Sequence, residues 1–311
     1  MPGRTIAERD ALQRTSEAQR EHERRLVVEH YEHDPEIFSL VLDRDLTYST
    51  GVFLSDDEDL ETAQRRKLAR VVAKLDLQAG ELVLDAGCGW GSILLYIAQH
   101  TGGFVSGVTL SARQRDVALA RAAERGVSER VRIDLAHVED LALAPESVDA
   151  VVFSGSIVHM HNREAIYEQV GRALCPGGRL LVSDCFFPQQ ARGNRESHAT
   201  DYIFVTALGY CRLLSLSEEL ALIERAGMDV LHVEDLTKSY VLTVNHWINN
   251  IRRNRDRIEA LAPGFARILQ TYMAIGRLSF HRRTALEYMV LAVKGRPRLN
   301  VGAWPVQGPA A

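Results

Sequence analysis

The sequence predicts an α/β fold of the Rossmann-like type, in which helices cover a seven-stranded, mostly parallel sheet. Apolar, β-branched runs alternate with amphipathic stretches from residue 81 to residue 185, as is typical of a parallel sheet covered on both faces. One of these runs, 83–86, ends in three glycines spaced one apart, and a helical stretch follows. The 46% hydrophobic content suffices for a sizeable core in a chain of 311 residues.

The segments before the sheet are expected to be helical. Residues 1–30, rich in Arg and Glu, are typical of an exposed helix, and a second helix is expected from about Leu60 to Leu75. Ser55 followed by Glu58 matches a capping box, although this helix could equally begin a few residues later.

The first five strands are expected to alternate with helices. Each strand is a short run rich in Val, Ile and Leu, and each helix has apolar residues three or four positions apart. Gly126 is expected to end one helix, and Cys175–Gly178 is expected to form a turn before a strand. The predicted strands are 81–86, 104–110, 131–136, 148–154 and 179–185, and the helices between them are 92–100, 112–125 and 163–174.

The pattern changes after Pro188. Strand-like runs at 228–236 and 286–293 alternate with helical segments at 188–226 and 240–282. We expect these two helical segments to form one cap over the strand ends, within a domain that spans 61–295. Residues 1–60 would form a helical extension that covers the active site, and residues 296–311, rich in Pro and Gly, a flexible tail.

Composition excludes several classes of protein. A formal net charge of −4 indicates no bias toward nucleic acid. Four cysteines without a C-x-x-C pair favour a reduced, cytoplasmic chain over a disulfide or zinc framework. No stretch approaches the ~18 apolar residues of a membrane span, so stable membrane insertion is not expected. A small-molecule substrate is therefore the expected partner.

The glycine-rich turn is the strongest functional signal. Glycines let the backbone turn tightly and approach a ligand that a Cβ would block. Gly87, Gly89 and Gly91 form G-x-G-x-G, whereas the dinucleotide fingerprint would place its third glycine at Ser92. G-x-G-x-G is the form found at the S-adenosylmethionine (SAM) site of class I methyltransferases. Asp85, at the end of the first strand, would orient the methionine part of SAM, or would serve as an anion at a helix N-terminus.

Four segments together resemble the cyclopropane-fatty-acid and mycolic-acid cyclopropane synthase family. They are Tyr31–Phe38, Leu42–Ser49, Leu84–Gly91, and Gly107–Ser111 followed by Gln114. The resemblance implies a class I methyltransferase that uses SAM and releases S-adenosylhomocysteine (SAH). The cofactor-binding residues that it implies are Tyr48, Ser49, Asp85, Gly87, Gly89, Gly91, Thr109, Leu110, Ser111, Gln114, His137, Val138 and Ser154.

Two of these positions differ from common patterns. Many class I methyltransferases bind the ribose through an acidic residue after the second strand, where this chain offers the hydroxyls of Thr109 and Ser111. His137 and Val138 stand where the resembled family has Trp-Glu beside adenine. An imidazole can stack on adenine or hydrogen-bond to it, and Glu139 could replace the carboxylate.

The bicarbonate site of the resembled family is mostly missing. Thr50 and Gly276 replace cysteines, Val158 replaces a glutamate, and Ser183 replaces a histidine. Tyr240 alone matches. Loss of a carboxylate and an imidazole removes both hydrogen bonds and charge balance, so bicarbonate binding is not expected.

Two residues are the catalytic candidates. His159 matches the family's histidine and would act as general base or hydrogen-bond the substrate, or would only hold its loop. Tyr240 would donate a hydrogen bond to substrate, or would be a core tyrosine. His159 and His161 form H-x-H without an evident third ligand, so no metal is expected.

The predicted function is SAM-dependent methyl transfer to a small, largely apolar acceptor of specialised metabolism, with carbon slightly favoured as the methylated atom. Two alternatives stay open. One is ring closure, such as cyclopropane formation by deprotonation and internal displacement, with SAM or SAH bound. The other is a non-catalytic SAM-binding module. The N-terminal helix is compatible with a homodimer.

Overall fold

The computed structural model describes residues 25, 28, 31, 33–188 and 211–295. Its centre is a seven-stranded sheet of order β3-β2-β1-β4-β5-β7-β6. All neighbouring strands pair in parallel except β7, which is antiparallel to both β5 and β6. The predicted fold class is therefore confirmed. The strands are β1 (Leu82–Ala86), β2 (Phe104–Thr109), β3 (Val131–Leu135), β4 (Val148–Ser154), β5 (Leu174–Phe186), β6 (Met228–Asp235) and β7 (Leu286–Lys294).

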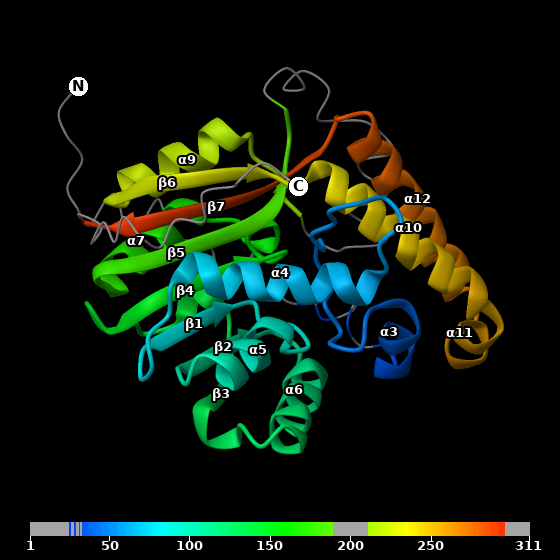
Figure 1. The fold of residues 1–311 in the computed structure, drawn as a ribbon, viewed down its shortest axis with the longest axis horizontal. Helices are drawn as coiled ribbons and strands as arrows, with labels where there is room; N and C mark the ends of the chain where they lie inside the picture. Colours follow the sequence, from blue (N-terminus) through cyan, green and yellow to red (C-terminus); the bar gives the residue numbers. More distant parts are fainter. Residues whose placement is uncertain (1–24, 26–27, 29–30, 32, 189–210, 296–311) are drawn as a thin grey trace.

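Helices cover both faces of the sheet, as the continuous apolar runs of the strands require. On one face lie α4 (Leu60–Leu75), α5 (Ser92–His100) and α6 (Ala112–Glu124), which share a core with one side of the strands. On the other lie α7 (Arg163–Ala173) and α9 (Leu216–Arg225). Figure 1 shows α4 crossing in front of the strands and α7 behind them. Three short 3-10 helices complete this part: η1 (Ser128–Arg130), η2 (Val138–Asp140) and η3 (Ile157–His159).

Most predicted boundaries agree with the structure to within a few residues, and the exceptions have local causes. Helix α4 spans Leu60–Leu75 as predicted, but its N-cap is Asp59, whose carboxylate accepts from Thr62 N. Ser55 and Glu58 do not cap a helix, because α4 begins at Leu60. The Glu58 carboxylate instead accepts from Leu54 N and pairs with Arg66. Strand β5 begins at Leu174, so the predicted turn at Cys175–Gly178 lies within the strand's bounds.

The cap consists of α10 (Thr237–Arg253), α11 (Arg255–Leu261) and α12 (Phe265–His281), with α3 (Pro35–Val41) beside them. These helices share an apolar cluster that includes Phe38, Trp90 and Trp247, and they lie together at one end of the molecule (Figure 1). One part of the expected cap is wrong: α9 packs on α7 and β6 instead of α10–α12. Residues 189–210, 1–24 and the predicted tail 296–311 lie outside the described residues.

Candidate active site

The glycine turn after β1 has the backbone that its sequence requires. Gly87, Gly89 and Gly91 have φ values of +93°, +51° and +84°, in a region that residues other than glycine rarely adopt. A Cβ on Gly87 would lie 2.4 Å from the Cβ of Ser156, and one on Gly91 would lie 2.9 Å from the Cβ of Ala118. Gly87 thus allows the ends of β1 and β4 to approach closely, and Gly91 allows α6 to pack on the turn.

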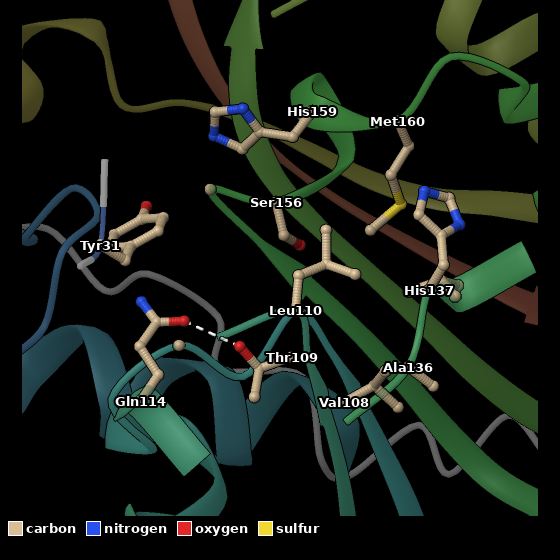
Figure 2. A pocket seen from close by; sticks show the side chains of 14 residues that line it. Tyr31, Val108, Thr109, Leu110, Gln114, Ala136, His137, Ser156, His159 and Met160 are labelled. Carbon is tan, nitrogen blue, oxygen red and sulfur yellow. Dashed lines mark hydrogen bonds between the residues drawn. The ribbon is translucent and has the colours of Figure 1, made fainter. Parts of the chain in front are cut away.

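A pocket opens at the carboxyl ends of the parallel strands, where α/β sheets bind ligands (Figure 2). In Figure 2, Thr109 and Gln114 lie on one side, with Tyr31 opposite His137 and with His159 above. Thr109 donates a hydrogen bond to Gln114 Oε1 at 2.8 Å. The lining residues are Tyr31, Gly87, Gly89, Val108, Thr109, Leu110, Gln114, Ala136, His137, Val138, Gly155, Ser156, His159 and Met160.

The pocket brings together about half of the residues that the sequence predicts for the cofactor. Gly87, Gly89, Thr109, Leu110, Gln114, His137 and Val138 line it, together with the predicted catalytic His159. Other predicted residues are not among its lining residues: Tyr48, Ser49, Asp85, Gly91, Ser111, Ser154 and Tyr240. Ser111 has a structural task, because its hydroxyl accepts from Gln114 N and caps α6.

Asp85 is a buried carboxylate with an unmet hydrogen bond. Its side chain is 2% exposed, and Oδ2 has no partner among the described residues. Burial raises the pKa of Asp85 to about 7, while the charge of Lys67 opposes that rise. A buried carboxylate oxygen without a donor is costly, so the position suits a cationic group of a ligand.

His137 lies at the far wall of the pocket and is 3% exposed. Its Nδ1 accepts from Glu139 N at 3.2 Å, which begins η2. In the neutral ring this bond places the hydrogen on Nε2. Val138 beside it is 6% exposed and adds an apolar surface.

The loop 43–53 places Tyr48 and Ser49 beside the sheet. The Asp43 carboxylate accepts from Thr47 N at 2.7 Å, and Gln64 Nε2 donates to the carbonyl of Ser49 at 2.8 Å. Further along, Gly51 N donates to Thr243 Oγ1 of α10 at 2.9 Å. Bonds within the loop and to two helices therefore fix its course.

Lys67 is a site residue that sequence reasoning missed. It is fully buried, and its Nζ donates to Ser49 Oγ at 3.0 Å and to Ser154 Oγ at 2.9 Å. Burial lowers the pKa of Lys67 to about 8, against the opposing charges of Asp85, Asp43 and Glu287. The sequence did contain a sign of this buried charge, because Lys67 lies within the apolar face of α4 between Ala63 and Val71.

Two buried carboxyl groups near the ends of β5 and β7 were also missed. Glu287 accepts from Ser183 Oγ at 3.2 Å and from Cys185 Sγ at 3.3 Å, and burial raises its pKa to about 8. Asp184 accepts from Val158 N at 3.4 Å, and burial raises its pKa to about 6. A charged residue inside the apolar run of β7 was the available signal for Glu287.

Tyr240 lies in the cap and packs edge-on against Phe280, with ring centroids 4.4 Å apart. Burial, with smaller contributions from Cys185 and Tyr272, raises the pKa of its hydroxyl. Of the positions where the resembled bicarbonate site differs, Thr50 donates to the neighbouring carbonyl of Gly51, and Ser183 donates to Glu287.

The described residues contain neither a cluster of metal ligands nor a membrane-spanning helix. Within 33–188 and 211–295, no three His, Cys, Asp or Glu side chains are grouped to hold a metal ion. In that same part of the chain, no helix has both the length and the apolar content to cross a bilayer.

The strand order, the left-handed glycine turn and the pocket at the strand ends define a class I methyltransferase, a SAM-dependent enzyme class. Residues 18–288 match the profile of the family described as mycolic acid cyclopropane synthetase, which is most of the chain. The chain belongs to that family.

Named relatives act on different acceptors. A probable fatty acid methyltransferase of Pseudomonas putida is 30% identical over 88% of this chain and 71% of its own length. The 27-O-demethylrifamycin SV methyltransferase of Amycolatopsis mediterranei is 29% identical over 77% of this chain and 87% of its own. Among solved structures, a cyclopropane synthase from Mycobacterium tuberculosis is 22% identical, with a TM-score of 0.81 over 87% of this chain and 98% of its own.

Proposed function

We propose that this protein transfers the methyl group of SAM to a small, largely apolar acceptor, with carbon favoured over nitrogen and oxygen as the methylated atom. The observation that carries the proposal is the pocket lined by Gly87 and Gly89, together with the buried Asp85 near the end of β1, whose Oδ2 has no hydrogen-bond partner among the described residues. SAM has a cationic amino group that could pair with the Asp85 carboxylate, and a nucleoside that could fill the pocket.

In this proposal, different residues bind different parts of SAM. Asp85 accepts from the amino group, Thr109 and Gln114 face the ribose, and His137 with Val138 holds adenine. When bound, SAM supplies an electrophilic methyl group on a sulfonium. The protein aligns the acceptor for in-line attack and excludes water from it.

His159 is the proposed base. It lines the same pocket as the cofactor residues, on η3 at the end of β4 (Figure 2). An imidazole titrates near neutral pH and can take the proton that an acidic carbon or a nitrogen loses. We propose that bicarbonate takes no part, because Val158 and Ser183 provide neither carboxylate nor imidazole. Tyr240 would then order the acceptor under the cap.

The names of the relatives support methyl transfer and leave the acceptor open. One relative is named for fatty acids and another for a demethylrifamycin. A carbon acceptor without charge fits the apolar side of the pocket, which Leu110 and Met160 contribute.

The first test is calorimetric titration with SAM and SAH, followed by incubation with SAM and pools of candidate acceptors. We expect both ligands to bind and SAH to accumulate with an acceptor whose product gains one methyl group. His159→Ala should lower the rate at which SAH forms during turnover without weakening SAH binding, and His161→Ala is the matched control. A cyclised product without SAM consumption would support ring closure instead. Failure to bind SAM and SAH would refute the proposal.

A further inference from the structure

Lys67 is a charge in an unusual place. It is fully buried on the sheet-facing side of α4, and its ammonium reaches the carboxyl ends of the central strands. Its hydrogen-bond partners are Ser49 and Ser154, both neutral. Among the described residues it forms no ion pair within 4 Å, because none of their ion pairs includes Lys67.

Asp85, Asp43 and Glu287 act on the Lys67 ammonium from a distance, but none of the described carboxylates is hydrogen-bonded to it. A buried charge without a direct ionic partner is costly, and a ligand that accepts hydrogen bonds from this group lowers that cost. The two hydroxyls satisfy two of its three hydrogens. Ser154 in turn donates to Ser49 Oγ at 3.3 Å. In the described part of the chain, Ser49 donates no hydrogen bond from its own hydroxyl, so the series Lys67, Ser154, Ser49 ends in a hydrogen that is available to an acceptor.

Asp85 needs a hydrogen-bond donor, whereas the series that ends at Ser49 needs an acceptor. Its Oδ2 lacks a donor, and each of the two charges shifts the pKa of the other. An unsatisfied carboxylate and a hydroxyl polarised by an ammonium are together complementary to a group with both charges, the α-ammonium and α-carboxylate of an amino acid.

We propose that Lys67 is a positioning residue that recognises the carboxylate of the amino-acid part of SAM, through the hydroxyls of Ser49 and Ser154. This inference rests on the proposed function, since it assumes that SAM is the ligand. Asp85 then holds the ammonium end, and Lys67 stabilises the carboxylate end. Together they fix the direction in which the sulfonium faces the acceptor.

The ammonium form of Lys67 is the form that attracts a carboxylate, so the effect depends on pH. Burial lowers the Lys67 pKa to about 8, and the charges that face it are Asp85 on β1, Asp43 in the loop and Glu287 on β7. Binding of a carboxylate favours the protonated lysine. Affinity for the amino-acid part therefore falls as the pH rises through about 8.

The test compares two probes that differ in the amino-acid part: SAH, and 5′-methylthioadenosine, which lacks that part. Lys67→Met should weaken SAH binding about ten- to a hundredfold, the usual range for a lost charged hydrogen bond, and leave methylthioadenosine within about twofold. Lys74→Met is the matched control, since it makes the same change on the same helix at a position that pairs with Glu234.

A second measurement needs no variant. In the unaltered protein, the ratio of SAH affinity to methylthioadenosine affinity should fall between about pH 7 and about pH 9. In Lys67→Met only two contributions should remain, because both groups titrate in both proteins: ionisation of Asp85, which favours the ligand's ammonium as the pH rises, and deprotonation of the ligand's own amino group, which weakens binding. If Lys67→Met does not fold, Ser49→Ala takes its place, because it removes the hydroxyl at the end of the series.

The outcomes are distinct. Equal weakening of both probes by Lys67→Met would assign Lys67 a purely structural role and overturn the inference, as would unchanged binding of both. If the unaltered protein bound methylthioadenosine and SAH equally well at every pH, the inference would fail while the nucleoside site stood. If it bound neither, the proposed function would fail as well.

Discussion

Replacing Glu287 with Gln should make the stability of this protein less dependent on pH. The carboxyl is 3% exposed, and burial raises its pKa from 4.5 to about 8. Glutamine keeps the size and can accept from Ser183 and Cys185, but it cannot ionise. The comparison therefore removes the titration of Glu287, together with its influence on the pKa of Lys67.

The sign follows from which state holds the proton. Below pH 4.5 the carboxyl is neutral in both the folded and the unfolded chain, and burial carries no charge penalty. Between 4.5 and about 8 the unfolded chain loses the proton while the folded chain keeps it, so the free energy of unfolding falls as the pH rises. Above about 8 the loss levels off.

The size follows from the two pKa values. One pKa unit corresponds to about 1.4 kcal/mol, so a shift of this size removes about 3 kcal/mol of stability between about pH 5.5 and about pH 8.5. Urea unfolding at both pH values would measure the loss in the unaltered protein and in Glu287→Gln. The variant should lose about 3 kcal/mol less than the unaltered protein over that interval.

Glu129→Gln, a substitution of an exposed carboxyl in η1, is the control and should follow the unaltered protein. Parallel pH profiles for the unaltered protein and Glu287→Gln would refute the reasoning. Such a result would mean that the folded protein ionises Glu287 without penalty.

Three further predictions concern the turn, the anion and the core. Gly87→Ala should abolish measurable SAH binding by calorimetry, because a Cβ there would meet Ser156 at 2.4 Å, whereas Gly126→Ala, at φ +67° in open space, should leave binding intact. Asp85→Asn should weaken SAH at least about tenfold by the same method, since a charged hydrogen bond is lost; unchanged affinity would contradict the role of Asp85. Arg163→Met should lower the free energy of unfolding by about 3–5 kcal/mol, because Glu219 would be left buried without its ion-pair partner and with only the hydrogen bond from Tyr167. Glu219→Leu in the same chain should restore part of that loss.

The sequence predicted what depends on neighbouring residues. Positive φ at Gly87 and Gly91 follows from a strand that must turn directly into a helix, and the apolar runs of β1 and β4 follow from burial on both faces. These requirements are local, so a motif of nine residues contains them.

The sequence did not predict contacts between distant residues. Lys67 meets Ser154 across 87 positions, and Glu287 meets Ser183 across 104, so no local pattern links them. The placement of α9 was missed for a different reason. An amphipathic helix has the same pattern whichever apolar surface it covers, and Ile223 fits the sheet as well as it would fit a cap.

The site residues come from separate stretches of chain. Thr109, Gln114 and His137 belong to one continuous segment of the chain, 108–138, which contains α6 and β3, whereas the buried charges Lys67 and Asp85 lie upstream of it. Substitutions in the first group leave the hydrogen bonds of the second untouched. Selection can thus vary the residues that face the nucleoside while Lys67 and Asp85 continue to hold the amino-acid part of SAM. The same holds for an engineer who seeks an enzyme that accepts altered nucleosides.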